Sequence, residues 1–243
     1  MSTVETLQQS IAALRPIERA EIAYWLREFE LRQYHVEEAA TDYHADSDDE
    51  RVQKIVRQVA DGERDSLTFE EYVELMKVST TRYELLCGLM FAMSGPSLVH
   101  NRICGHLFAR FYNHLRGGPC VAYASDATVR LKITEDVVAY LPDVMVACEK
   151  WDASKHWVDQ PRLIVEVLSP STHLIDRREK LQNYRTAESL EEYVLVSQTV
   201  PEVTIYRRKE RWKPSVVRSV EAHAEFRSID LTLPLAQIYE NAL

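Results

Sequence analysis

The chain has 243 residues, of which 46% are hydrophobic and 28% are charged, and its formal net charge is −9 at pH 7. This length and composition are enough for a proper core in one large domain, or in one domain with an appendage. No apolar run approaches the length of a membrane span and the N-terminus lacks a basic-then-apolar signal pattern, so we expect a cytoplasmic protein with no membrane partner.

The N-terminal quarter of the sequence has a helical pattern. Residues 4–34 carry apolar side chains at helical spacing, interrupted at Pro16. A polar stretch over residues 37–50 is typical of a linker, and residues 52–60 predict a further short helix. The predicted organisation is a helical segment and linker over residues 1–62, followed by a mixed domain over residues 63–243.

Helices and strands are both predicted in the mixed domain, in chain order. They are a hairpin over residues 82–93, a helix over 98–115, strands near 120–124, 128–133, 138–147 and 163–168, a helix over 171–187, strands near 193–196, 203–207 and 216, and a closing helix over 235–239. This order predicts an α/β fold with a sheet of mixed direction flanked by helices.

The cysteines and histidines form no recognisable metal motif in the sequence. Cys87, Cys104, Cys120 and Cys148 lack CxxC spacing, so they are interpreted as reduced thiols that form neither a zinc cage nor a disulfide framework. His106 and His114 are interpreted as ordinary residues of the helix over 98–115, because no HExxH pattern accompanies them.

Two carboxylates stand in otherwise apolar, strand-like runs. Asp143 precedes Val144, and Glu166 lies inside the run over residues 163–168. Burial of an unpaired carboxylate costs several kcal/mol, so Glu166 is expected to be protonated, paired or bound to a metal. Two acids on adjacent strands would form a hard-oxygen site suited to Mg²⁺ or Mn²⁺.

Several consecutive stretches resemble one family of nucleases. They are residues 82–86 followed by Gly88, then residues 141–144, 165–172 and 192–196, together with Asp176, Lys180 and Tyr184 at four-residue steps. The pattern is similar to the PD-(D/E)XK nuclease superfamily and, within it, to the Uma-two family of bacterial endonucleases. The resemblance implies a restriction-endonuclease-like fold and a metal-dependent endonuclease that acts on nucleic acid, with DNA as the expected partner.

The resemblance also implies roles for individual residues. Asp143 and Glu166 would be the metal ligands and catalytic acids, and Glu84 an additional catalytic acid. The superfamily's lysine two residues after the second acid is replaced by Leu168, so Lys180 is interpreted as a migrated catalytic lysine. His100, Asp176 and Tyr184 are candidates to line the cleft.

Each role has a structural alternative. Lys180 and Asp176 could form an exposed ion pair of little energetic value. Glu84 could face solvent at the edge of the hairpin, and Asp143 could cap a turn after Pro142.

Charge leaves a second function open. Nucleic-acid affinity comes largely from Lys and Arg, so the acidic balance and Leu168 both favour a nuclease-fold module that binds a partner or forms a homodimer without cutting. Residues 15–31 weakly resemble antitoxins of addiction modules; the alternative is a helical hairpin that packs on the main domain or on a second copy. A basic cluster over residues 207–213 is interpreted as a solvated hairpin tip, with contact to phosphate as the alternative.

Overall fold

The structure is a computed structural model, and it describes residues 54, 66–77, 79, 81–93, 95–133, 136–150, 152–169 and 179–243. The chain divides into two compact units. The first comprises Met1–Met93 and Ile133–Val138, and the second comprises Ser94–Lys132 and Ala139–Leu243. The predicted N-terminal helices, apart from Lys54, and the predicted boundary after residue 62 lie outside the described residues.

The first unit contains a helix that the sequence pattern did not reveal. Helix α4 spans Phe69–Met76 and begins at Thr68, whose side chain accepts a hydrogen bond from the Glu71 backbone while the Glu71 carboxylate accepts one from the Thr68 backbone. This reciprocal capping box satisfies backbone donors that the first helical turn would otherwise leave unpaired. The Tyr72 hydroxyl donates to the Tyr83 carbonyl at 2.8 Å and joins the helix to the adjacent hairpin.

The predicted hairpin over residues 82–93 is confirmed as β1 (Tyr83–Leu86) and β2 (Leu89–Ala92). Its two-residue turn consists of Cys87 and Gly88, both with positive φ. Tight hairpin turns of this kind favour glycine. A Cβ at Gly88 would also lie 2.3 Å from the Cβ of Ser66, so no larger residue fits without a shift.

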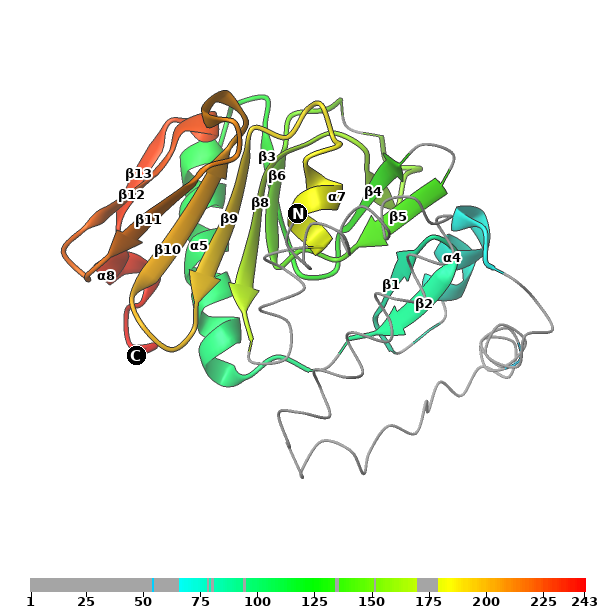
Figure 1. Cartoon of the computed structure of the whole chain (residues 1–243), viewed down its shortest axis with the longest axis horizontal. Coiled ribbons are helices and arrows are strands. Elements are labelled where there is room, and N and C mark those ends of the chain that lie inside the picture. Colours follow the sequence, from blue (N-terminus) through cyan, green and yellow to red (C-terminus); the bar gives the residue numbers. More distant parts are fainter. Residues whose placement is uncertain are drawn as a thin grey trace, which may run out of the picture. The chain divides into compact units, whose positions relative to one another are not determined.

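The second unit is built on a six-stranded mixed sheet, which confirms the α/β prediction (Figure 1). Strands β8 and β9 are parallel and all other neighbours are antiparallel. The strand order is β11 (Pro214–Arg218), β10 (Glu202–Arg207), β9 (Glu192–Ser197), β8 (Pro161–Leu168), β6 (Val144–Ala147) and β3 (Val121–Ala124).

The predicted strand region over residues 138–147 is two strands. Strand β5 (Asp136–Tyr140) ends before Pro142, and β6 begins after Asp143. Proline cannot donate a ladder hydrogen bond, which accounts for the break. The remaining elements are β4 (Thr128–Ile133), β7 (Trp157–Val158), η2 (Arg208–Glu210), β12 (His223–Phe226), η3 (Arg227–Ile229), β13 (Leu231–Pro234) and α8 (Leu235–Ile238). Within the described part of the chain, no helix combines the length and apolarity that a membrane crossing requires.

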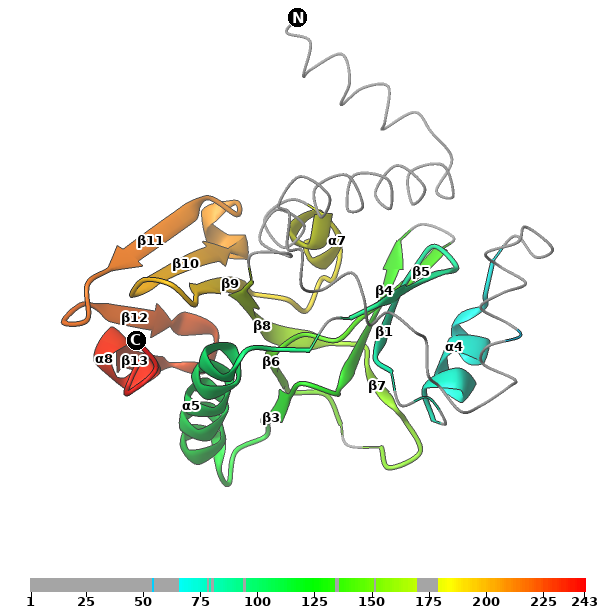
Figure 2. The same ribbon diagram turned by 90° about the horizontal axis from the view of Figure 1, so that it is seen from below.

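Helices cover both faces of the six-stranded sheet (Figure 2). The predicted helix over residues 98–115 is confirmed as α5 (Leu98–Leu115), which begins at the capping side chain of Ser97. Its buried side chains share one core with the valines of β8, namely Val165 and Val167. Helix α7 (Leu181–Tyr184) lies on the opposite face. Strand residues alternate between faces, so Glu166 points toward the α7 side.

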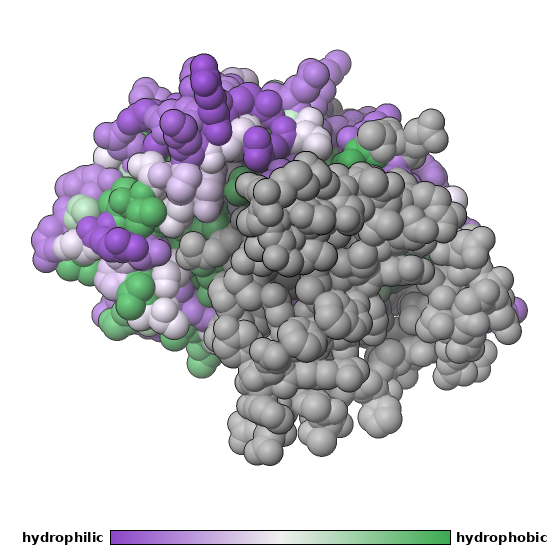
Figure 3. Space-filling model, in the orientation of Figure 1, coloured by the Kyte–Doolittle hydropathy of each residue, from purple (hydrophilic) through white to green (hydrophobic). Residues whose placement is uncertain are grey.

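Hydrophilic side chains gather over the end of the sheet where β10 passes into β11 (Figure 3). This turn contains residues 208–213, which belong to the basic cluster over residues 207–213 that the sequence predicts as a hairpin tip. The prediction of a hairpin at this position is confirmed by the antiparallel pairing of β10 and β11.

The prediction that all four cysteines are reduced is wrong for two of them. Cys120 and Cys148 form a disulfide, whereas Cys87 and Cys104 are free. The cause is strand pairing: Val121 lies opposite Ala147 in the β3–β6 ladder, and the same register brings the next pair of residues together. The separation of 28 residues in sequence concealed this proximity.

A buried carboxylate holds the C-terminal elements against the sheet. Glu192 is 1% exposed. One oxygen of Glu192 accepts hydrogen bonds from Arg207 Nε at 2.8 Å and Arg227 N at 3.1 Å. The other oxygen accepts from the backbone and hydroxyl of Ser228 at 2.9 and 2.6 Å. Every acceptor direction is used, which compensates the cost of burying this charge.

Replacement of Glu192 by alanine is expected to lower the free energy of unfolding by about 3 to 5 kcal/mol, because it removes the buried carboxylate that pairs with the buried Arg207 guanidinium. Chemical denaturation measures this loss. The matched control is Arg218→Ala, which removes the Arg218–Glu202 pair on the neighbouring strands and should cost at most about 1 kcal/mol because Arg218 is exposed. A loss within about 1 kcal/mol for Glu192→Ala would contradict the proposed importance of the network.

Candidate functional site

Asp143 lies in the loop between β5 and β6, where it contacts both β8 and α5. Its Oδ2 accepts a hydrogen bond from the backbone of Val167 at 2.7 Å and lies 3.1 Å from His100 Nε2. Both side-chain hydrogen bonds therefore use Oδ2 and leave Oδ1 outside them. Val144 lies opposite Val165 in the β6–β8 ladder, so one further step of the register brings the backbone of Asp143 alongside Glu166.

Glu166 is a buried, paired carboxylate on β8. The side chain is 4% exposed, and its Oε1 accepts hydrogen bonds from Lys180 Nζ at 3.1 Å and from the Tyr184 hydroxyl at 2.9 Å. Of the three states expected for a carboxylate in this strand, pairing is the one observed. Lys180, the N-cap residue of α7, and Tyr184, the last residue of this helix, thus contact the same carboxylate.

Lys180 does not belong to an exposed pair. It is 4% exposed, and its ammonium lies 5.3 Å from the centre of the Tyr140 ring. The hydroxyl of Tyr140 in turn donates to Glu179 and accepts from Asn183, at 2.9 and 2.6 Å. A buried ammonium needs a negative partner, and Glu166 supplies it. Asp176, the other member of the predicted pair, lies outside the described residues.

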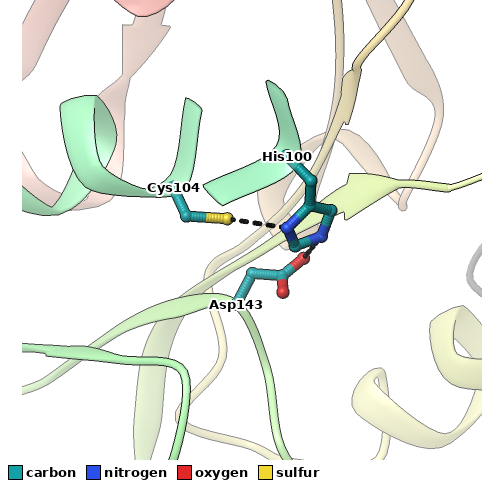
Figure 4. A group of neighbouring side chains, drawn as sticks. All are labelled: His100, Cys104 and Asp143. Atoms are coloured by element: carbon teal, nitrogen blue, oxygen red, sulfur yellow. Dashed lines mark hydrogen bonds and ion pairs between the residues drawn. The ribbon is translucent and has the colours of Figure 1, made fainter. Parts of the chain in front are cut away.

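His100 links Asp143 to a cysteine one helical turn along α5 (Figure 4). Its Nε2 faces Asp143, and its Nδ1 lies 3.5 Å from Cys104 Sγ. A carboxylate accepts and does not donate, so the tautomer that satisfies both contacts has the proton on Nε2. Nδ1 then accepts from the Cys104 thiol. His100 therefore orients Asp143, and Cys104 orients His100.

The order thiol, imidazole, carboxylate is that of a nucleophilic triad, but Cys104 lacks the electrostatics of a nucleophile. Its thiol is buried, and burial raises the pKa well above its ordinary value, with Asp143 and Glu166 raising it further. The thiolate is the reactive form of cysteine. Cys104 at neutral pH is thus a protonated hydrogen-bond donor.

The same three side chains have the spacing of a metal site. One ligand atom from each of His100, Cys104 and Asp143 can be chosen so that all three lie within 4.8 Å of one another. A nitrogen, sulfur and oxygen set suits ions such as Zn²⁺, whereas Mg²⁺ prefers oxygen alone. Glu166 is not part of this group, so the pairing of Asp143 with Glu166 on one metal stays a prediction.

The remaining predicted residue, Glu84, lies on β1 in the first unit. It is 4% exposed and therefore does not face solvent at the hairpin edge, as the alternative interpretation required. Its role as an additional catalytic acid stays a prediction.

Two residues that belong to the site were missed in the sequence. Cys104 follows His100 by four residues on a predicted helix, a spacing that places two side chains on one face and could have revealed the contact. Tyr140 carried no such signal, because its place beneath Lys180 depends on how α7 folds back over the sheet.

A mixed sheet bearing an acidic loop, an acidic central strand and a lysine on the covering helix defines the restriction-endonuclease-like class of fold. The family model that matches residues 69–238 is Uma2, described as "Putative restriction endonuclease". The chain belongs to this family, which confirms the Uma-two resemblance.

Relatives and a solved structure agree with the assignment. The uncharacterized protein slr1290 of Synechocystis is 33% identical over 71% of this chain and 91% of its own length. A second uncharacterized Synechocystis protein, sll1609, is 32% identical over 66% of this chain and 92% of its own length. The crystal structure of a "putative nuclease" of the DUF820 group from Anabaena variabilis superposes with a TM-score of 0.59 over 73% of this chain and 99% of that one. At 15% identity, this likeness concerns the fold alone.

The raised pKa of Cys104 predicts a pH-dependent stability. The thiol of the unfolded chain ionises above pH 9.0, its ordinary pKa, while the folded thiol keeps its proton. The folded state then binds more protons than the unfolded state, so the free energy of unfolding falls as pH rises. This group contributes a slope of at most about 1.4 kcal/mol per pH unit above that value. Denaturation of wild type and Cys104→Ala between neutral and alkaline pH measures it. Parallel profiles for the two proteins would contradict the assignment.

Proposed function

We propose that this protein is a divalent-metal-dependent endonuclease that hydrolyses phosphodiester bonds of nucleic acid, with DNA as the expected substrate. The observation that carries the proposal is the contact of Lys180 with Glu166 at 3.1 Å. This contact supports the interpretation of Lys180 as a migrated catalytic lysine. Leu168 occupies the strand position of the superfamily's lysine, and the Lys180 ammonium reaches the same strand from the covering helix instead.

The donor set is compatible with a divalent cation. Asp143 and Glu166 would hold Mg²⁺ or Mn²⁺ through carboxylate oxygens, the ligands that these hard ions prefer. Asp143 fits this role because its two side-chain hydrogen bonds both use Oδ2. When bound, the ion would supply Lewis-acid polarisation of the scissile phosphate and neutralise developing charge.

The protein's own groups have distinct tasks in this proposal. Lys180 carries three donors, and one of them engages Glu166. In this proposal its ammonium stabilises a phosphate oxygen that gains charge in the transition state. Tyr184 donates to Glu166 and would hold its orientation. His100 would hold Asp143 in place through Nε2.

The second candidate is a nuclease-fold module that binds a partner or forms a homodimer without cutting. The buried position of Lys180 favours it, because a lysine–glutamate pair inside a core is also a structural element. A cytoplasmic location is part of the first proposal, and the Cys120–Cys148 bond weighs against it, since disulfides are rare in reducing compartments.

Metal binding is tested by calorimetric titration of Mn²⁺. Asp143→Ala is expected to lower the affinity by about tenfold or more, because even residues that only support metal ligands contribute on this scale. Asp152→Ala is the matched control, because Asp152 is exposed and its carboxylate accepts hydrogen bonds from the backbone and hydroxyl of Ser154. Equal Mn²⁺ affinity in wild type and Asp143→Ala would remove Asp143 from the ligand set.

Catalysis is tested by single-turnover cleavage of DNA and RNA substrates with saturating Mg²⁺ or Mn²⁺. Lys180→Met is expected to lower the rate by about 10²-fold or more through lost transition-state stabilisation. The control is Lys155→Met, which removes a partly exposed ion pair with Asp159 and should leave the rate unchanged.

Folded fractions must be compared by circular dichroism, because Lys180→Met also removes the partner of Glu166. A folded Lys180→Met protein that cleaves within about threefold of wild type would remove this residue from the catalytic set. No cleavage by wild type with either metal would favour the binding module.

A further inference from the structure

The turn between β10 and β11 has an unusual backbone for the residues that it carries. Arg211 and Trp212 occupy its two central positions with φ of 56° and 58°. The turn closes with a hydrogen bond from Lys213 N to Glu210 O at 3.3 Å. Positive φ at both central residues is the conformation of a type I′ turn, for which Asn-Gly and Asp-Gly are preferred. Bulky residues in this region are uncommon.

The same chain meets the usual requirement elsewhere. The β1–β2 turn places glycine at its second central position. Residues 208–213, which we call the basic turn, instead contain arginine and tryptophan where smaller residues would be less strained. Strain of this kind is tolerated where the side chains have another task.

The basic turn is anchored to the loop that follows α7. Arg208 Nε donates to the Leu190 carbonyl at 2.7 Å, and Nη2 of the same residue donates to the carbonyls of Arg185 and Ala187. The Trp212 ring covers this guanidinium, with the Arg208 Cζ 5.0 Å from the ring centre. Arg208 is thus engaged structurally, and Trp212 fixes it in place.

Other cations of the basic turn are exposed. Lys209, Arg211 and Lys213 are exposed, as is Arg185 in the anchored loop. None of these four side chains takes part in an ion pair with the residues that the structure describes. The acid of the turn, Glu210, is already paired with Arg207 and Arg227. The exposed Glu188 is an acid in the anchored loop. A concentration of positive charge thus persists in a chain whose net charge is −9.

The geometry of the sheet relates the basic turn to the candidate site. Glu166 on β8 lies opposite Leu195 on β9. Arg207 on β10, where the turn begins, lies opposite Glu192, which is also on β9. Along the strand direction the two positions are therefore three residues, or about 10 Å, apart. This is about three steps along one strand of a duplex at 3.4 Å each. Figure 3 shows the hydrophilic surface at this end of the sheet.

We propose that the basic turn contacts the sugar–phosphate backbone of nucleic acid that occupies the candidate site, through Lys209, Arg211 and Lys213. The inference rests on the proposed function for its ligand, but not on cleavage. Such contacts carry no sequence information and fix the register of the nucleic acid on the protein. They would supply the positive charge that the acidic composition lacks.

The test is fluorescence anisotropy of a labelled DNA duplex in EDTA, which prevents cleavage, over about 50 to 200 mM salt. The variant carries Lys209→Ala, Arg211→Ala and Lys213→Ala together. Each lost phosphate contact should reduce the slope of log K against log salt by about 0.9. The triple variant is therefore expected to lose about two to three from the slope's magnitude and to bind more weakly at low salt.

The matched control removes three exposed cations elsewhere in the second unit, by Arg116→Ala, Lys132→Ala and Lys150→Ala. Its net charge equals that of the first variant, and its slope should stay at the wild-type value. An equal loss in the control would overturn the proposal, because the effect would then follow overall charge. Wild-type behaviour of the first variant would overturn it as well.

Arg211→Gly separates binding from folding. Glycine suits the positive φ, so this variant should melt at or above the wild-type temperature while its salt slope falls by about one. A wild-type slope would count against the proposal. Turn-dependent binding to phosphatidylserine vesicles, without binding to DNA, would overturn it in favour of a lipid surface.

The cleavage experiment is independent of these outcomes. DNA binding that depends on the basic turn, in a protein that does not cut, would sustain this inference and defeat the proposed function. If wild type and the triple variant both cleave DNA, and DNA binding by the two proteins has the same salt dependence, the proposed function would stand and this inference would be overturned.

Discussion

The structure of the second unit depends on one constraint, the carboxylate of Glu166 inside the central strand β8. The neighbours of Glu166 on β8, Val165 and Val167, belong to the apolar core beneath α5. Glu166 projects to the other face, where a bare charge would be costly. Lys180 and Tyr184 supply a cation and a hydroxyl, and both come from the segment of α7. The face of the sheet opposite the core is thus organised by charge compensation, and α7 lies where Glu166 requires it.

Asp143 is held by a separate set of contacts that begins on the core side. Cys104 is part of the apolar core, and its thiol contacts the imidazole of His100, one helical turn earlier. The Asp143 carboxylate in turn accepts hydrogen bonds from this imidazole and from the Val167 backbone. The two acids therefore have different supports although their backbones are neighbours. One is tied to a protonated thiol through an imidazole, and the other to an ammonium.

Much of the fold was predictable from local patterns, because β-branched runs and helical spacing report burial directly. The strands around Glu166, helix α5 and the β10–β11 hairpin were predicted for this reason. The proximity of Lys180 to Glu166 was predicted only through the family resemblance, since α7 must fold back over the sheet. The Cys120–Cys148 bond and the Glu192 network were missed. Both depend on strand register and on distant C-terminal contacts, which no local pattern encodes.

The disulfide has a consequence for the edge of the sheet. Strand β3 is an edge strand of four residues, and an antiparallel edge can slip by two residues without moving any side chain to the wrong face. A covalent bond between Cys120 and Cys148 forbids that slip. At the other end of the same ladder, the Ser125 backbone donates to the carbonyl of Asp143 at 3.0 Å. The disulfide thus fixes the register of β3 against β6. It thereby also fixes the position along β3 at which the loop of Asp143 is held.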